Sequence, residues 1–281
     1  MKKNKEYIKS HKFLKAVVTD LDGTLLNKNH TVAPKDIEAL QEIGEQGICR
    51  IIATGRSLYS YSQVLPSDFP TDYLISSAGG GITELKTGKL IRVAKIDSVK
   101  VREIARKLDA YKIDFQVREA IPRGHCYAYK RYFDHNPDFD RLNANYREFS
   151  YPIESIDKLG DASRIISIAP NLDYIEYFNS FSEYSIIRAT SPIDGQSVWM
   201  EIYPSGVNKG NALKWLLDRL QLPLKDTIGL GNDYNDIHFL DITKESFVVN
   251  EAPESLKKVY RTTVSHNKAP LHQCLKTCGI I

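Results

Sequence analysis

Short apolar runs alternate with an amphipathic segment over the first third of the chain. Three runs predict strands because apolar and β-branched residues fill them: Lys15–Thr19, Ile48–Ile52 and Asp72–Gly81. A helical pattern begins at Pro34, a residue suited to the first turn of a helix, and Gly47 marks its end. Strands that are nearly continuous in apolar residues and alternate with helices indicate a parallel sheet covered on both faces.

The pattern changes after about residue 83. A helical stripe over Asp97–Tyr111 leads into segments in which polar and apolar residues alternate, as in strands with one exposed face: 115–119, 126–133, 164–170, 185–190 and 197–204. The alternation of helices and apolar strands resumes at Val207. Asn208 is expected to cap a helix, and two more strands are expected after it. We therefore predict an α/β fold, with a Rossmann-like parallel-sheet core (residues 1–82 and 202–281) and an inserted α+β domain (residues 83–201).

Composition and charge narrow the class of protein. The 281 residues are 42% hydrophobic and 26% charged, which is enough material for a large core or two domains. With 38 basic and 35 acidic residues, the net charge of +3 is too balanced to indicate nucleic-acid or membrane binding through the global field. Residues 1–15 are basic but lack the apolar region of a signal peptide, so we expect a solvated tail.

The cysteines indicate a reducing environment. Cys49, Cys126, Cys274 and Cys278 are scattered and lack the spacing of a zinc site, so we expect four free thiols in a cytoplasmic protein. No uninterrupted apolar run in the sequence approaches the length that crosses a membrane. The sequence carries no indication of an oligomeric state.

Two carboxylates stand one residue apart where the first predicted strand ends, in Asp20-Leu21-Asp22-Gly23-Thr24. Like charges so close repel one another, and burying either one unpaired is costly. A Mg²⁺ ion between Asp20 and Asp22 would relieve the repulsion, leaving one carboxylate as a nucleophile and the other to transfer protons. The alternative is a strand-end turn in which Asp and Gly only begin a loop.

Two further candidates follow predicted strands or begin helices. The Thr54 hydroxyl and the backbone N–H groups of Gly55 and Arg56 are suited to an anion. Taken alone, this signal favours the alternative, in which Thr54 caps a helix. Lys209 begins a helix, where the helix dipole disfavours a cation. A phosphate or a carboxylate beside Lys209 would explain its position; the alternative is a solvated surface lysine.

The segment Gly229–Leu240 combines close backbone approach with oxygen ligands. Gly229 and Gly231 lie at the end of a predicted strand, and a helix is expected to begin near Ile237. Between them lie side chains that suit Mg²⁺: Asn232, Asp233, Asn235 and Asp236. The alternative is an Asx-rich turn that caps the helix.

In this order the four motifs resemble the haloacid dehalogenase superfamily of aspartate-based phosphohydrolases. "DLDGTLL" is similar to the first motif, "ATGR" to the Thr of the second, "VNKGNAL" to the Lys of the third and "GLGNDYNDIHFL" to the fourth. The insertion after "ISSAGGGI" resembles the α/β cap of the Cof-type subfamily. The resemblance spans nearly the whole chain. In the core it rests on the motifs, and in the cap it rests only on the order of the predicted elements.

The resemblance implies a Mg²⁺-dependent phosphatase of a small phosphorylated metabolite, such as a sugar phosphate or a phosphorylated cofactor. Asp20 would form an aspartyl-phosphate, and Asp22 would protonate the leaving alcohol and then activate water. The expected metal ligands are Asp20, the Asp22 carbonyl and either Asn232 or Asp233. Asp236 would either bind the metal as well or orient Lys209. The expected phosphate contacts are Thr54, Gly55, Arg56, Lys209 and Asn235. Cap side chains that could contact a second anion or sugar hydroxyls are Arg118, Arg123, His125 and Arg188; the alternative is a surface or structural role.

Two departures from the family pattern leave alternatives open. Cof-type proteins usually have Gly-Asp-x-x-Asn-Asp in the fourth motif, but here Asn232 occupies the first acidic position and Asp233 follows it. Ala78 stands where an Asn usually precedes Gly before the cap. One alternative is a phosphotransferase or phosphosugar mutase, which would use the same core. The other is a non-catalytic regulator that binds a phosphometabolite, and Asn232 is the sequence feature that supports it.

Overall fold

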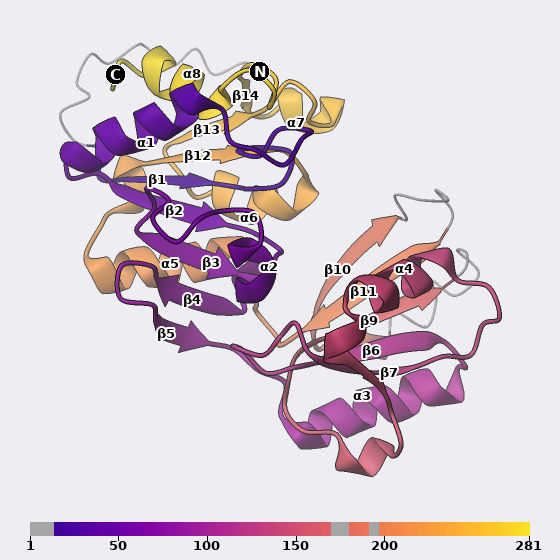
Figure 1. The fold of residues 1–281 in the computed structure, drawn as a ribbon. Helices are drawn as coiled ribbons and strands as arrows, with labels where there is room; N and C mark the ends of the chain where they lie inside the picture. The colour runs from indigo at the N-terminus through magenta and orange to yellow at the C-terminus, as the bar shows by residue number, and fades with distance from the viewer. Residues whose placement is uncertain (1–13, 170–179, 191–196) are drawn as a thin grey trace. The chain divides into compact units, whose positions relative to one another are not determined.

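The computed structural model describes residues 14–169, 180–190 and 197–281 (Figure 1). Most of the expected basic tail therefore lies outside the described residues. The chain divides into two compact units. The first comprises Met1–Ala53, Asp68–Tyr73 and Leu213–Ile281, and the second comprises Thr54–Ser67 and Leu74–Ala212. The domain boundaries expected from the sequence stay a prediction.

The first unit contains five parallel strands in the order β14-β13-β12-β1-β2. Their bounds are Ala16–Thr19 (β1), Cys49–Ala53 (β2), Thr227–Gly231 (β12), Glu245–Val248 (β13) and Arg261–Thr262 (β14). Every residue of the neighbouring strands β1 and β12 is buried, as their apolar sequences predict. The expected parallel sheet is thereby confirmed. Ligands of such sheets bind at the carboxyl ends of the strands.

Helices that accompany these strands in the described part of the first unit are α1 (Pro34–Glu45), α6 (Ile237–Leu240), α7 (Glu254–Lys257) and α8 (Pro270–Thr277). Pro34 lies in the first turn of α1, and Gly47 follows the helix with φ +75°, so both predicted ends are confirmed. Figure 1 shows α1 and α8 side by side along the strands. The carboxylate of Asp36 in α1 accepts a hydrogen bond of 2.8 Å from the backbone N–H of His272 in α8.

The third predicted strand ends earlier than its sequence suggests. β3 covers Tyr73–Ser76, because Ser77 (φ 49°) and Ala78 (φ 54°) adopt the left-handed conformation and form a short 3₁₀ turn, η1 (Ser77–Gly79). The chain then forms an antiparallel pair, β4 (Gly81–Glu84) and β5 (Lys89–Val93). Two consecutive left-handed non-glycine residues cost about 1–2 kcal/mol each, and such strain is typical of functional loops.

The second unit also contains a six-stranded sheet in the order β10-β11-β9-β6-β7-β8. The bounds are Asp114–Glu119 (β6), Tyr127–Lys130 (β7), Ser150–Pro152 (β8), Ala162–Ala169 (β9), Ser185–Thr190 (β10) and Val198–Tyr203 (β11). All neighbouring pairs are antiparallel except β7 and β8. The alternating segments of the middle of the chain therefore form the α+β unit that they predict.

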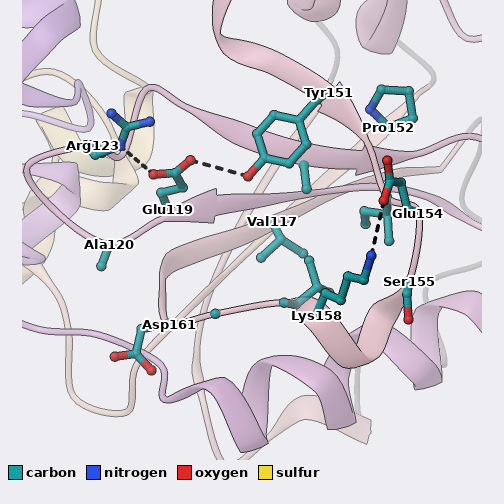
Figure 2. Close-up of a pocket in the computed structure, with 14 residues that line it drawn as sticks. Val117, Glu119, Ala120, Arg123, Tyr151, Pro152, Glu154, Ser155, Lys158 and Asp161 are labelled. Carbon is teal, nitrogen blue, oxygen red and sulfur yellow. Dashed lines mark hydrogen bonds and ion pairs between the residues drawn. The ribbon is translucent and has the colours of Figure 1, made fainter.

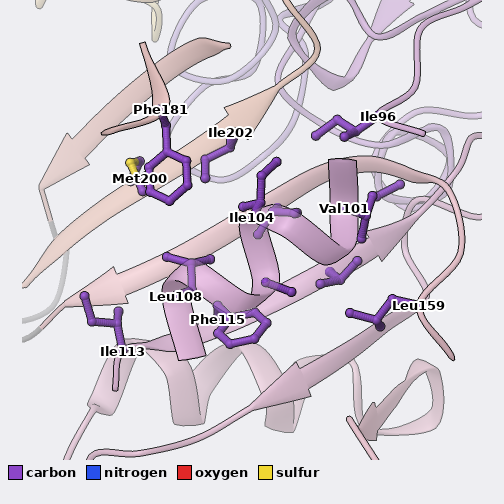
Figure 3. Close-up of a cluster of buried hydrophobic side chains, with 14 of the residues drawn as sticks. Ile96, Val101, Ile104, Leu108, Ile113, Phe115, Leu159, Phe181, Met200 and Ile202 are labelled. Carbon is purple, nitrogen blue, oxygen red and sulfur yellow. The ribbon is translucent and has the colours of Figure 1, made fainter. Parts of the chain in front are cut away.

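A helix packs on each face of this sheet. On one face, Val101, Ile104 and Leu108 of α3 (Ser98–Ala110) join Phe115 and Met200 in a buried cluster (Figure 3). On the other, Phe139 of α4 (Pro137–Asn145) packs against Ile166 and Ile168 of β9. Successive β9 residues thus face different helices, as strand geometry requires.

Helix α5 (Lys209–Leu220) follows the sheet in the chain. Its expected N-cap is confirmed, because the Asn208 side chain accepts a hydrogen bond of 2.8 Å from the backbone N–H of Asn211. All four cysteines are free, as expected. Within the described ranges, no helix is long and apolar enough to span a bilayer.

Candidate active site

Asp20 directly follows β1 and is fixed through its backbone. Its N–H donates to the carbonyl of Leu230 in β12 at 2.8 Å, which extends the pairing of the two strands by one residue. The residue is only 4% exposed. A carboxylate at the carboxyl end of a parallel strand lies at the edge where open α/β sheets bind their ligands.

The turn after Asp20 lies against the loop after β12. The Asn232 side-chain nitrogen Nδ2 is 3.1 Å from the backbone carbonyl oxygen of Asp22 and donates a hydrogen bond to it. Gly23 has φ +70°, and a Cβ there would lie 2.6 Å from the same Nδ2. Glycine is therefore favoured at residue 23 by its left-handed conformation, and a Cβ there would also displace the Asn232 amide. The structure thus brings the Asn232 side chain to the Asp22 carbonyl. The sequence had left open whether Asn232 or Asp233 would lie there.

Asp233 has a different role from its neighbour. Its side chain is exposed and accepts a hydrogen bond of 2.7 Å from the backbone N–H of Tyr234, in a capping box with Asp236. Capping was the alternative interpretation of this segment, and it is confirmed for Asp233. The geometry favours Asn232 over Asp233 as the residue that completes a site with Asp22.

Asp236 fixes the loop that carries Asn232. The carboxylate is fully buried, and its Oδ2 accepts hydrogen bonds from the backbone N–H groups of Asn232 (2.8 Å) and Asp233 (3.2 Å). Gly231 makes this possible, because a Cβ there would lie 2.7 Å from Asp236 Oδ2. Asn235 lies beside it with a buried Oδ1 that has no hydrogen-bond partner among the described side chains and backbone. The roles expected for Asp236 and Asn235 at metal and phosphate stay predictions.

In the second unit, Thr54 belongs to a loop held by backbone hydrogen bonds. The Thr54 carbonyl accepts from the Ala78 N–H at 2.9 Å, and the Arg56 carbonyl accepts from the Ser77 N–H at 2.7 Å. Thr54 does not cap a helix: Ser57 caps α2 (Leu58–Ser62), and Thr54 Oγ1 accepts from the Arg56 N–H at 3.1 Å. Gly55 is exposed with open space above its Cα, so a ligand can approach its backbone closely.

Lys209 is buried, at 1% exposed, at the first position of α5. The alternative of a solvated surface lysine is therefore wrong. The turn η1 lies against the start of this helix, since a Cβ on Gly79 would be 2.4 Å from the Asn208 carbonyl oxygen. η1 thus contacts both the Thr54 loop and the residue before Lys209. A buried cation at a helix N-terminus favours negative groups beside it, and the phosphate-binding role expected for Lys209 stays a prediction.

Comparison with known proteins assigns the family. A family model described as haloacid dehalogenase-like hydrolase matches residues 17–270. The chain belongs to this family. The family expected from the four motifs is confirmed, and with it an enzyme of the hydrolase class.

Relatives of this hydrolase are named phosphatases. An HMP-PP phosphatase of Yersinia enterocolitica is 26% identical over 248 residues, which cover 85% of each chain. A solved structure of a haloacid dehalogenase phosphatase from Bacteroides thetaiotaomicron has a TM-score of 0.82 at 20% identity, with both chains covered completely. A solved sugar phosphatase of subclass IIB has a TM-score of 0.74 at 19% identity and covers 95% of this chain and 100% of its own. The two structures confirm the α/β fold expected for this family.

The expected site residues of the hydrolase form two groups. In the first unit, the ends of β1 and β12 bring together Asp20, Asp22, Asn232, Asp233, Asn235 and Asp236. In the second unit, the loops after β2 and β3 and the start of α5 hold Thr54, Gly55, Arg56 and Lys209. That both groups serve one substrate stays a prediction of the family resemblance.

The second unit also contains a cavity of about 730 Å³ that involves none of these residues (Figure 2). Its charged lining residues have opposite partners: Glu119 with Arg123, Glu154 with Lys158, and Asp161 with Lys95. Figure 2 shows the Glu119 carboxylate between Arg123 and Tyr151. Because its charges are neutralised in pairs, this cavity is poorly suited to a phosphate group.

The cap side chains expected to contact substrate differ in their surroundings. Arg123 pairs with Glu119, and its side chain is 67% exposed. His125 stacks on the Tyr59 ring of α2 at 4.5 Å, and burial followed by the nearby Arg123 lowers its pKa. Arg118 is buried, whereas the Arg188 side chain lies outside the described residues.

One arginine of the second unit was not expected from the sequence. Arg164 Nη1 donates to the carbonyl of Gly55 at 3.1 Å and to the Tyr203 hydroxyl at 2.6 Å. The sequence signal was an arginine in phase with Ile166 and Ile168, on one face of a predicted strand. This contact links the six-stranded sheet to the Thr54 loop.

Proposed function

We propose that the chain is a magnesium-dependent phosphatase that hydrolyses a small phosphorylated metabolite through an aspartyl-phosphate on Asp20. The observation that carries the proposal is the position of Asp20, the Asp22 carbonyl and Asn232 at the ends of two neighbouring parallel strands, in a chain of the haloacid dehalogenase family. Ligands of open α/β sheets bind at this edge.

The donors in the first unit fit Mg²⁺. Among the described residues, no group of three or more His, Cys, Asp and Glu side chains is arranged to hold a metal ion. The donors here are instead mixed: the Asp20 carboxylate, the Asp22 carbonyl and the Asn232 amide, which presents Oδ1 when it rotates by half a turn. All are hard oxygens of the kind that Mg²⁺ prefers, and the bound ion would neutralise negative charge on carboxylate and phosphate.

Asp20 and Asp22 divide the chemistry between them. An Asp20 carboxylate oxygen attacks phosphorus, and the bond to the leaving alkoxide breaks as the Asp22 carboxyl group gives that oxygen its proton. The Asp22 carboxylate then takes a proton from water, which attacks the aspartyl-phosphate and releases inorganic phosphate and Asp20. Asp22 is partly exposed, in keeping with its exchange of protons with water, whereas Asp20 is buried.

Thr54, Lys209 and the backbone of Gly55 and Arg56 hold the phosphoryl oxygens in this proposal. The buried Lys209 ammonium supplies a fixed positive charge, and fixed charges account for most of the rate enhancement in phosphoryl transfer. Sugar phosphates and phosphorylated cofactors are the proposed substrates, supported by relatives named sugar phosphatase and HMP-PP phosphatase. A cytoplasmic location is proposed with them.

Magnesium-dependent release of phosphate from 4-nitrophenyl phosphate tests the proposal. The native chain is expected to turn over with Mg²⁺ and to stop when EDTA is added. Asp20→Asn should lower kcat by at least about 10³-fold, because the nucleophile is lost. Asp68→Asn is the matched control, since Asp68 is exposed and remote in sequence from every motif.

Three results would contradict the assignment. Undiminished turnover by Asp20→Asn would exclude Asp20 as the nucleophile. Isomerised sugar phosphate in place of inorganic phosphate would identify a mutase. Phosphate-ester binding without any turnover would identify a regulatory protein.

A further inference from the structure

Two arginines face one another on the sheet of the cap. Arg118 of β6 and Arg164 of β9 are directly opposite in the antiparallel register. They lie on the face of the sheet on which α4 packs, opposite the α3 cluster shown in Figure 3. Like charges directly opposite one another on neighbouring strands are destabilising, so a negative group is expected beside them.

The part of the chain that the structure describes supplies only some of that negative charge. Glu201 Oε2 is 3.6 Å from Arg164 Nη1 and accepts a hydrogen bond of 2.6 Å from the Tyr203 hydroxyl. Burial alone would lower the pKa of Arg164, but the Glu201 carboxylate and the Tyr203 hydroxyl together raise it. Glu201 therefore neutralises Arg164, and the described residues form no comparable ion pair with the Arg118 guanidinium.

Arg118 has no carboxylate partner among the described residues. It is 4% exposed, its Nη2 donates to Gln116 Oε1 at 3.0 Å, and its Nε is buried without a hydrogen-bond partner. Burial, and then the nearby Arg164, lowers its pKa to about 10. A charge removed from water in this way is costly without a negative partner, and the described residues place no carboxylate in contact with it.

Two tyrosines hold the Arg118 guanidinium in a fixed position. Its Cζ is 4.4 Å from the centre of the Tyr127 ring and 5.2 Å from the centre of the Tyr146 ring. Tyr127 is itself fixed by hydrogen bonds to Leu142 and Asn143. Aromatic rings orient a guanidinium but do not neutralise it, so its donors remain suited to an anion.

The position of the pair indicates which anion it binds. Arg164 contacts the Gly55 carbonyl, in the loop that holds phosphate in the proposed function. We propose that Arg118 and Arg164 bind a second anionic group of the substrate, so that the substrates are phosphate esters carrying a further carboxylate or phosphate. This inference rests on the proposed function and narrows its substrate class.

Matched substrate pairs test this inference. The carboxylate pair is 3-phosphoglycerate against glycerol 3-phosphate, and the phosphate pair is fructose 1,6-bisphosphate against fructose 6-phosphate. The native enzyme is expected to favour the doubly anionic member at least tenfold in kcat/KM in one pair or both, and the pair that responds identifies the second group.

Variants then separate binding from structure. Arg118→Gln is expected to remove the preference by at least tenfold while changing kcat/KM for 4-nitrophenyl phosphate less than twofold. Arg118→Lys, which retains the charge, should retain part of the preference even if the Gln variant folds poorly. Arg106→Gln is the matched control, an exposed arginine on α3 at the opposite face of the sheet.

The inference is overturned if the native enzyme shows no preference in either pair, or if the preference survives Arg118→Gln. A purely structural Arg118 would lower the rates with all substrates equally. If no ester at all is hydrolysed, the proposed function fails instead, and calorimetric Kd values for the same pairs decide the inference: equal Kd values within each pair reject it, and a tenfold preference supports it.

Discussion

At the scale of single residues, the turn after β1 and the loop after β12 constrain each other. Gly23 is left-handed and its Cα lies close to the Asn232 amide, so no other residue fits at position 23 without strain and displacement. The left-handed conformation alone would cost another residue about 1–2 kcal/mol. The Asn232 side chain lies at the Asp22 carbonyl, so in the proposed function it would set how much negative charge the metal ion meets.

Asn232→Asp should strengthen Mg²⁺ binding. The substitution adds a carboxylate beside the Asp22 carbonyl without changing the shape of the side chain. We expect the Mg²⁺ concentration that gives half-maximal activity to fall about tenfold, equivalent to about 1.4 kcal/mol. A magnesium titration of phosphate release measures it, and an unchanged or higher requirement would reject Asn232 as a ligand.

Asp233→Ala provides the contrast. Because the Asp233 side chain caps the backbone N–H of Tyr234, its loss should lower the free energy of unfolding by about 1 kcal/mol. The magnesium requirement should stay the same. If the variant instead needs much more Mg²⁺ at unchanged stability, Asp233 and not Asn232 is the ligand.

The sequence predicted the identity of these residues better than their roles. The motifs identified Asp20 and Asp22 through their spacing, but "GNDYND" could not distinguish Asn232 from Asp233, since a shift of one residue satisfies the same pattern. The capping bond of Asp233 favours Asn232 as the ligand, and the amino-acid composition of the segment does not reveal such a bond to a neighbouring backbone N–H. Lys209 was ambiguous for the same reason, because burial depends on the elements around it.

At the scale of elements, α8 lacks a cap from its own sequence. Its N-cap position is Ala269, and the buried Asp36 of α1 takes over by accepting the N–H of His272. Burial raises the pKa of Asp36 from 3.8 to about 7, although the backbone N–H groups of His272 and Leu271 lower it. We therefore expect the contact between α1 and α8 to depend on pH.

Asp36 should make folding weaker as the pH rises. Between about pH 4 and 7 the unfolded chain releases a proton that folded Asp36 retains, so its contribution to stability is present at low pH and is lost as the pH passes its folded pKa. The loss is at most about 4 kcal/mol, from three pKa units at about 1.4 kcal/mol each. Asp36→Asn should therefore gain stability relative to the native chain between pH 4.5 and 7.5.

Urea unfolding of both proteins at the two pH values measures this difference. The control is Glu38→Gln, which alters an exposed carboxylate on the same helix. A difference between Asp36→Asn and the native chain that does not change with pH would show that Asp36 titrates normally.

The elements that the sequence missed have local causes. The prediction overlooked α4, although Asn136 caps it and Pro137 occupies its first turn, because its short apolar stripe contains little more than Phe139 and Leu142. It extended β3 to Gly81, because nothing in "SSAGGG" shows that Ser77 and Ala78 are left-handed. Backbone hydrogen bonds to the Thr54 loop hold these residues in that conformation. The spacing of apolar residues along the chain cannot predict such contacts between distant segments.

At the scale of the whole molecule, the proposed function requires both compact units. Asp20 and its neighbours belong to the first unit, and Thr54 and Lys209 belong to the second. Neither group is a phosphatase site alone: the first supplies the nucleophile and the oxygen donors, and the second supplies positive charge and N–H donors. The proposed function therefore predicts that one ligand depends on residues of both units.

Mg²⁺ with orthovanadate, an analogue of the transferred phosphoryl group, should raise the Tm of the native chain. Saturation to about 100 Kd stabilises by about 2.7 kcal/mol, or about 5–10 °C at 2–4 °C per kcal/mol. Asp20→Asn in the first unit and Lys209→Met in the second should each abolish most of the shift, and the double variant should lose no more than either one. Lys214→Met, an exposed lysine on the same helix as Lys209, should respond like the native chain. If the two losses add independently, the two groups bind separate ligands and the single-site mechanism is wrong.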